Sequence, residues 1–234
     1  MSRARSRWFV AAVVVALVGI EALIYAAGIQ GVGWLVLVAG VLLVVVARLA
    51  GLSWTDLGFS PRTVPSGLRY GAIIICVVAV IAAVGVAFPP TRELFRNDRY
   101  TDLGAALTSA LVIIPFRTVL GEELLFRGVL LGALLRGFST KVALLIQALL
   151  FGLWHVMSSF GLASHNEGLR AVLGTGWLAT VGGIALAVIV TGTAGLLLGW
   201  LRIRSQSMLA PIALHWAANG VGAIAAALAW HLTG

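Results

Sequence analysis

The chain alternates between long apolar runs and short polar or charged connections. The apolar runs lie at about residues 8–29, 32–47, 70–88, 103–136, 140–160, 171–201 and 207–230. A transmembrane helix needs about 20 mostly apolar residues, so most of these runs are long enough to cross a bilayer. The pattern therefore predicts an all-α protein that is a polytopic bundle of transmembrane helices.

The number of spans depends on how the two longest runs fold. The runs at 103–136 and 171–201 are long enough to be broken helices or to include a re-entrant segment. Pro115 and Gly121 are plausible break points in the first of them. We predict seven or eight spans, which form a single integral membrane domain over residues 1–234.

The composition agrees with an integral membrane protein. The chain is 61% hydrophobic and 10% charged, with a mean hydropathy of +1.06, which excludes an ordinary soluble domain. A net charge of +8 would suggest nucleic-acid binding in a soluble protein. Here the basic residues lie at the ends of apolar runs, where they indicate membrane topology and contact with anionic lipids. We therefore expect a lipid bilayer and no nucleic acid as partner.

The distribution of basic residues predicts how the chain is oriented. With seven spans and a cytoplasmic N-terminus, the basic residues in cytoplasmic segments are Arg3, Arg5, Arg7, Arg48, Arg62, Arg69, Arg136, Lys141, Arg202 and Arg204. Those in external segments are Arg92, Arg96, Arg99 and Arg170. This excess on one side follows the positive-inside rule and places the C-terminus outside. Abundant Ala and Arg with a single Lys suggest a GC-rich bacterial genome, so we expect a multi-pass protein of a bacterial cell membrane.

Polar residues interrupt three of the apolar runs at similar depths. They are Glu122, Glu123 and Arg127 in one run, His155 in the next, and His215 and Asn219 in the last. A charged residue within the bilayer costs about 2.5–3.5 kcal/mol and usually faces a bundle interior or a cavity. With a rise of 1.5 Å per residue, Glu122 and His155 each lie about 21 Å from the basic residue at the cytoplasmic end of their helix. His215 and Asn219 lie about 17 and 23 Å from theirs. This agreement predicts an intramembrane polar cavity.

Helical spacing suggests different roles for the two glutamates. Adjacent residues point about 100° apart on a helix, so Glu122 and Glu123 cannot face the same point. Glu123 and Arg127 are four residues apart and are expected to form a structural ion pair. This leaves Glu122 to face the cavity, where a carboxylate suits a general base. Two further charged residues, Glu21 and Arg117, could line the cavity, but we expect them to pair with each other.

The histidines and the asparagine offer several kinds of chemistry. An imidazole can activate water, donate to an oxyanion or bind a metal. His215 and Asn219 share a face at a spacing of four, and an asparagine amide can stabilise an oxyanion. Glu122, His155 and His215 could also hold Zn²⁺ as an open three-ligand site. The sequence leaves a zinc cofactor and no cofactor as alternatives, although it has no ligand pair at the short spacing of familiar zinc helices.

Three motifs follow one another along the chain: Glu122-Glu123-x-x-x-Arg127, Phe151-x-x-x-His155 and His215-x-x-x-Asn219. In this order they resemble the CPBP family, the CAAX-protease and bacteriocin-processing family of intramembrane proteases, which is also called Abi. The family includes the prenyl-protein endopeptidase known as the Ras-converting enzyme. The resemblance covers a motif-bearing core at about residues 103–222.

The resemblance implies that the protein hydrolyses a peptide bond with an activated water. Glu122 would be the general base, and His155 would help to bind and activate the water. His215 and Asn219 would stabilise the oxyanion, with Glu123 and Arg127 in support. The family is often described as a metalloprotease family, but a metal-free, glutamate-dependent mechanism is also argued.

The substrate and two alternative functions stay open at this point. A prenylated CAAX substrate requires a prenylation system, so a membrane-associated peptide or protein is the safer expectation. Intramembrane acids and histidines also form proton relays, so a proton-coupled transporter is an alternative, although no inverted repeat is visible. The other alternative is a non-catalytic membrane scaffold or bacteriocin-immunity factor with the same fold.

Overall fold

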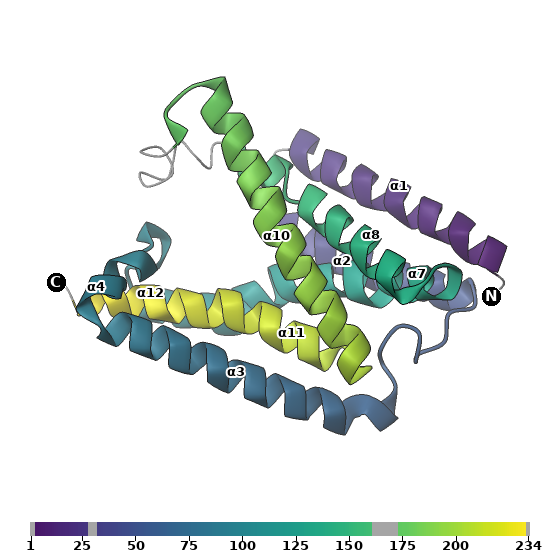
Figure 1. Cartoon of the computed structure of the whole chain (residues 1–234), viewed down its shortest axis with the longest axis horizontal. Helices are drawn as coiled ribbons and strands as arrows, with labels where there is room; N and C mark the ends of the chain where they lie inside the picture. The colour runs from purple at the N-terminus through teal and green to yellow at the C-terminus, as the bar shows by residue number, and fades with distance from the viewer. Residues whose placement is uncertain (1–2, 28–31, 161–172, 233–234) are drawn as a thin grey trace.

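The protein is a bundle of helices that lie mostly along the long axis of the molecule (Figure 1). The structure is a computed structural model that describes residues 3–27, 32–160 and 173–232, so Arg170 lies outside the described residues. Within these ranges the chain forms helices and turns and no strands, as the sequence predicts. The two ends of the chain lie at opposite ends of the molecule.

Seven helical segments correspond to the seven apolar runs. Five are single helices: α1 (Arg3–Ala27), α2 (Val32–Leu49), α3 (Val64–Ala87), α8 (Thr140–Leu153) and α10 (Trp177–Ser205). The fourth run comprises α5 (Leu103–Thr108), η4 (Ser109–Ile113), η5 (Pro115–Val119), α6 (Leu120–Glu123), η6 (Leu124–Leu130) and α7 (Leu131–Gly137). The last run comprises α11 (Leu209–Trp216), η8 (Ala217–Val221) and α12 (Gly222–His231). Short helices in the connections are η1 (Pro61–Thr63), α4 (Pro89–Arg92), η2 (Glu93–Phe95), η3 (Asp98–Tyr100) and η7 (Met157–Ser159).

Several of these segments are long and apolar enough to cross a membrane. Five candidate spans are Arg5–Tyr25, Pro61–Ala87, Leu103–Gly137, Trp177–Ser205 and Leu209–His231. The remaining two apolar segments, in α2 and α8, are shorter helices. The chain is therefore a multi-pass membrane protein, while the count of seven or eight spans stays a prediction.

The fourth apolar run is one continuous helix, so the expected break at Pro115 or Gly121 is wrong. Leu103–Gly137 extends over 35 residues. It contains three π-helical segments, η4, η5 and η6, in place of a break. Short π-helical segments inside α-helices are often found at functional sites. The run at 171–201 also shows no break between Trp177 and Ser205.

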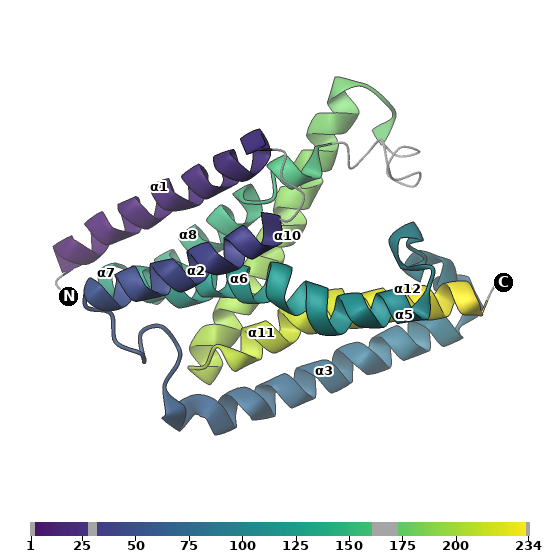
Figure 2. The same ribbon diagram turned by 180° about the vertical axis from the view of Figure 1, so that it is seen from behind.

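Gly121 serves close packing rather than a break. Helix α2 lies along the segment that contains α6 (Figure 2). A Cβ atom at Gly121 would lie only 2.7 Å from the backbone nitrogen of Leu37 in α2. Small residues of this kind let helix backbones approach closely in membranes. The contact fixes α6, and with it Glu122 and Glu123, against α2.

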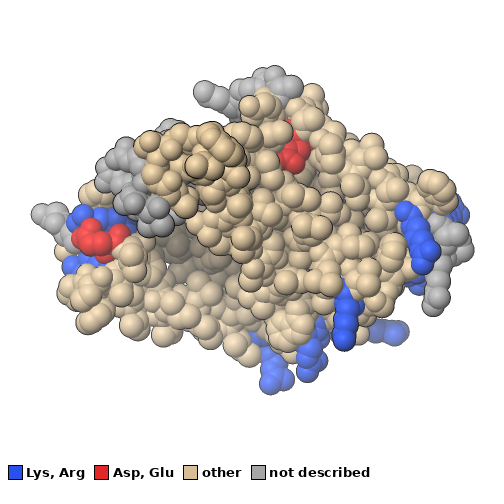
Figure 3. All heavy atoms as spheres, turned by 45° about the horizontal axis from the view of Figure 1, so that its top comes forward, with Lys and Arg blue, Asp and Glu red and all other residues tan. Residues whose placement is uncertain are grey.

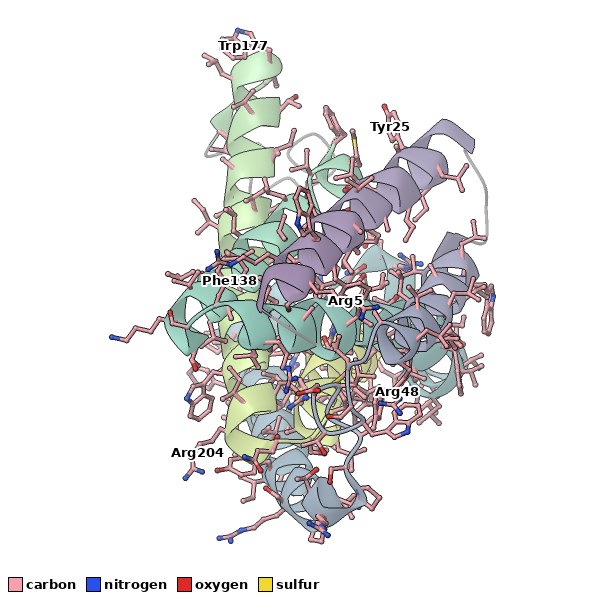
Figure 4. All side chains as sticks on the ribbon, turned by 90° about the vertical axis from the view of Figure 1, so that its right-hand side faces the viewer. Arg5, Tyr25, Arg48, Phe138, Trp177 and Arg204 are labelled. Atoms are coloured by element: carbon pink, nitrogen blue, oxygen red, sulfur yellow. The ribbon has the colours of Figure 1, made fainter. Side chains whose placement is uncertain are left out.

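Helix α10 crosses the bundle at a steep angle and packs on α8. Figure 4 shows α10 extending from Trp177 at one end to Arg204 at the other. A Cβ atom at Gly152 of α8 would lie 2.7 Å from the carbonyl oxygen of Val188 in α10. This close approach positions the C-terminal end of α8, which Trp154 and His155 follow.

The surface has charged ends and a middle with few charges. In Figure 3, Lys and Arg side chains gather at one end and along the adjoining rim, and a mixed group of basic and acidic side chains lies at the other end. A broad surface with few charges lies between them. This distribution suits a protein whose middle is surrounded by hydrocarbon.

Candidate functional site

A buried ion pair lies at the centre of the polar cluster. Glu123 and Arg127 are both 0% exposed, and Arg127 Nη1 donates to Glu123 Oε1 at 3.0 Å. The pair expected from the spacing of four residues is therefore present. The Arg127 guanidinium also lies over the ring of Phe151, with its Cζ atom 3.9 Å from the ring centroid. This cation–π contact links the pair to α8.

Glu123 has a second partner, which sequence reasoning missed. His215 Nδ1 donates to the same Glu123 oxygen, Oε1, at 2.8 Å. The two residues are 92 positions apart, so helical spacing gives no signal for this contact. Because a carboxylate oxygen only accepts, Nδ1 of His215 carries the proton. Glu123 thus fixes the orientation and the tautomer of the imidazole.

The other nitrogen of His215 is directed at Glu122. His215 Nε2 lies 3.9 Å from Glu122 Oε2, which is too long for a direct hydrogen bond. Glu122 and His215 are each 9% exposed. Among the described residues, Glu122 Oε2 has no hydrogen-bond partner. His215 therefore lies between two carboxylates, one bonded to it and one with a free oxygen.

His155 follows the last turn of α8 and contacts the backbone there. Its Nδ1 donates to the carbonyl oxygen of Phe151 at 2.8 Å, which satisfies an acceptor at the helix end. Because a carbonyl only accepts, this bond leaves the Nε2 of a neutral ring as an acceptor. The rings of His155 and His215 each make an edge contact with Phe151, at centroid distances of 4.8 and 6.2 Å. Phe151 therefore contacts Arg127, His155 and His215.

Asn219 lies apart from this cluster. It belongs to the π-helical segment η8 and is exposed. A π-helical turn follows i→i+5 hydrogen bonds, so residues four apart no longer align as in an α-helix. In the described part of the chain, no hydrogen bond joins Asn219 to His215. It lines a cavity of about 590 Å³ whose walls do not include Glu122, His155 or His215. The prediction of one shared cavity is therefore not confirmed.

The expected pair between Glu21 and Arg117 is wrong. Within the described ranges neither residue forms an ion pair with the other, and Glu21 Oε1 is buried without a hydrogen-bond partner. Glu21 lines a small pocket together with Trp154 and Met157, which follow α8 in the chain. Arg117 instead lines the cavity that contains Asn219. The two residues are on helices that do not present them to each other.

The candidate zinc ligands are not gathered as a metal site. Among the residues that the structure describes, no three His, Cys, Asp or Glu side chains lie close enough to hold an ion. The Nδ1 bonds of His155 and His215 leave Nε2 of each ring free, as in many metal-ligating histidines, so only the separation of the three side chains argues against a metal site. The side chains of Glu122, His155 and His215 are therefore not close enough together to hold Zn²⁺ in this arrangement.

Comparison with known proteins identifies the family. A model of the type II CAAX prenyl endopeptidase Rce1-like family matches residues 104–221, which is half of the chain. The matched region contains the ion pair, His155, His215 and Asn219. Comparisons with curated proteins and with solved structures found no match. The family match confirms the resemblance seen in the motifs: the chain belongs to the type II CAAX prenyl endopeptidase Rce1-like family, a family of proteases.

Proposed function

We propose that the protein is an intramembrane endopeptidase that hydrolyses a peptide bond in a membrane-associated substrate with a Glu/His-activated water. The observation that carries the proposal is the position of His215 between Glu123 and Glu122 inside the matched region. A histidine held by one carboxylate and facing another is an arrangement suited to proton transfer.

The proposed reaction begins with Glu122 as the general base. Its free Oε2 takes a proton from a water molecule, whose oxygen attacks the carbonyl carbon of the scissile bond. His155 accepts a hydrogen bond from this water through Nε2. The carbon–nitrogen bond then breaks, and Glu122 passes the proton to the leaving amine. This cycle returns Glu122 to its carboxylate form.

The proposed oxyanion site consists of His215 and Asn219. In its protonated form, His215 can donate from Nε2 while Nδ1 stays bonded to Glu123. Asn219 supplies a second donor when a bound substrate lies between its cavity and the glutamates. Glu123 and Arg127 hold His215 in place and do not touch the substrate.

A proteolysis assay tests the proposed function. The purified protein is placed in lipid vesicles with a library of peptides that carry a membrane anchor beside the cleavable segment. We expect cleavage that persists in the presence of a metal chelator, because the three candidate ligands are not close enough together to hold an ion. Loss of activity on chelation that Zn²⁺ restores would support the metal mechanism instead. Absence of cleavage, with a cellular phenotype that survives Glu122→Gln, would support the scaffold alternative.

We also propose that the N-terminus is cytoplasmic and the C-terminus external, in a bacterial cell membrane. The excess of basic residues in the segments assigned to the cytoplasm supports this orientation, as does the position of the two ends at opposite ends of the molecule (Figure 1). A phosphatase reporter fused to the C-terminus should be active, and a cytoplasmic fluorescent reporter at the same place should be dark. The reverse result would require an even number of spans.

A further inference from the structure

The cavity that contains Asn219 has a basic wall outside the glutamate–histidine cluster. Its volume is about 590 Å³, within the range of small-ligand sites. Its polar lining includes Arg96, Arg99, Ser109, Arg117, Thr118 and Asn219. No Asp or Glu is among its described lining residues. The two arginines from the connection between α3 and α5 lie at the end of the bundle, while Arg117 lies within the long helix.

Of the three arginines in this wall, Arg117 lacks both an ion pair and an aromatic ring partner among the described residues. Arg96 is paired with Glu93 at 2.8 Å and stacks on Trp230, and Arg99 lies over the ring of Tyr100. For Arg117 the described part of the chain provides neither an ion pair nor a side-chain hydrogen bond. Its side chain is half-buried within a candidate span. An arginine at such a position usually faces a partner or a functional cavity.

The chemistry of the guanidinium selects the kind of ligand. Its planar fork of donors matches the two oxygens of a carboxylate, and such pairs are among the strongest hydrogen bonds in proteins. The uncompensated charge of Arg99 nearer the end of the bundle would draw anions toward the cavity. Asn219 lines the same cavity and is one of the two proposed oxyanion donors. A ligand held in this cavity therefore lies beside the proposed reaction site. Because Asn219 belongs to both the cavity and the reaction site, a group on the substrate is favoured as the ligand over a lipid phosphate.

We propose that this cavity binds a carboxylate of the peptide substrate, with Arg117 as its direct partner. The carboxylate comes from the chain terminus or from an acidic side chain, since both present the same two oxygens. The assignment rests on the proposed protease function, and it makes Arg117 a residue that determines specificity. It predicts that the enzyme distinguishes charged peptides from neutral ones of the same shape.

Binding measurements separate this proposal from catalysis. They use the Glu122→Gln variant, so that the peptides are not cleaved, and fluorescent membrane-anchored peptides in two matched pairs. The peptides of the first pair differ in having a terminal carboxylate or a terminal amide. Those of the second pair differ in having Asp or Asn at one position. We expect one acidic peptide to bind about 10–100-fold more tightly than its neutral partner, as for a charge-assisted hydrogen bond. Adding Arg117→Gln should remove this difference without weakening the neutral peptide. Arg117→Lys should restore part of it.

A matched control variant and four outcomes decide the proposal. Arg204→Gln removes an exposed arginine outside the cavity lining and should preserve the difference between the acidic and neutral peptides. Equal binding of both peptides, or equal weakening of both by Arg117→Gln, would overturn the proposal. The proposal would also be overturned if Arg117→Gln changed only the stabilisation of the protein by phosphate-bearing lipids and not the binding of peptides. If the wild-type protein cleaves no peptide but the acidic preference depends on Arg117, the protease function fails while the carboxylate site stands.

Discussion

Replacing Glu122 with Gln is expected to reduce kcat/KM for peptide cleavage by at least about 10²–10⁴-fold, which is the usual contribution of a positioned acid or base. Glutamine keeps the shape of the side chain but cannot take a proton from water. Because Glu122 Oε2 has no hydrogen-bond partner in the described structure, the change should not disturb an existing contact of that oxygen. Cleavage rates of the vesicle-embedded variant, measured beside its thermal unfolding, test this expectation.

Asn219→Ala provides the comparison for this loss. Removal of one oxyanion donor lowers kcat by about 10²–10³-fold, so the effect of Glu122→Gln should be at least as large. Asn219 is exposed in its cavity, so its replacement should leave the fold intact. A Glu122→Gln variant that cleaves at the wild-type rate would show that another group is the base.

Replacing Glu123 with Ala is expected to destabilise the protein by about 3–5 kcal/mol, the usual effect of breaking a buried ion pair. The change leaves the fully buried Arg127 without its carboxylate and removes the partner of His215 Nδ1. Arg127 Nε and Nη2 already lack hydrogen-bond partners among the described residues, so the charge has no alternative acceptor nearby. We expect low yield of folded protein and early unfolding in detergent.

The exposed pair of Glu93 and Arg96 provides a matched control. Its atoms approach to 2.8 Å, but its side chains are 59% and 30% exposed, respectively. A solvent-exposed ion pair contributes only about 0–1 kcal/mol, so Glu93→Ala should leave the unfolding temperature almost unchanged. If Glu123→Ala and Glu93→Ala unfold alike, Glu123 does not stabilise the bundle in the way that we infer.

The sequence by itself was enough to predict the helical class, the membrane location and the family. These three properties depend on the composition of the chain and on the spacing of residues within single helices. Apolar runs of span length predict helices in a bilayer, because only internally bonded backbone is stable there. The pair of Glu123 and Arg127 is also local, since residues four apart lie on the same face of a helix. The order of the three motifs along the chain was enough to indicate the family that the family model then confirmed.

Only the tertiary structure decided how these helices present their polar side chains to one another. Depth estimates placed His215 near the glutamates, but the packing of α11 beside α6 determines that Glu123, rather than Glu122, bonds to it. The π-helical segment η8 changes the angular relation of Asn219 to His215, and hydrophobic spacing carries no signal for such a segment. Arg117 lines the cavity and does not pair with Glu21. The relative rotation of two helices decides such a contact, and it depends on all the side chains packed between them. Contacts between distant helices are long-range properties of the packed bundle, so no local pattern in the chain could determine them.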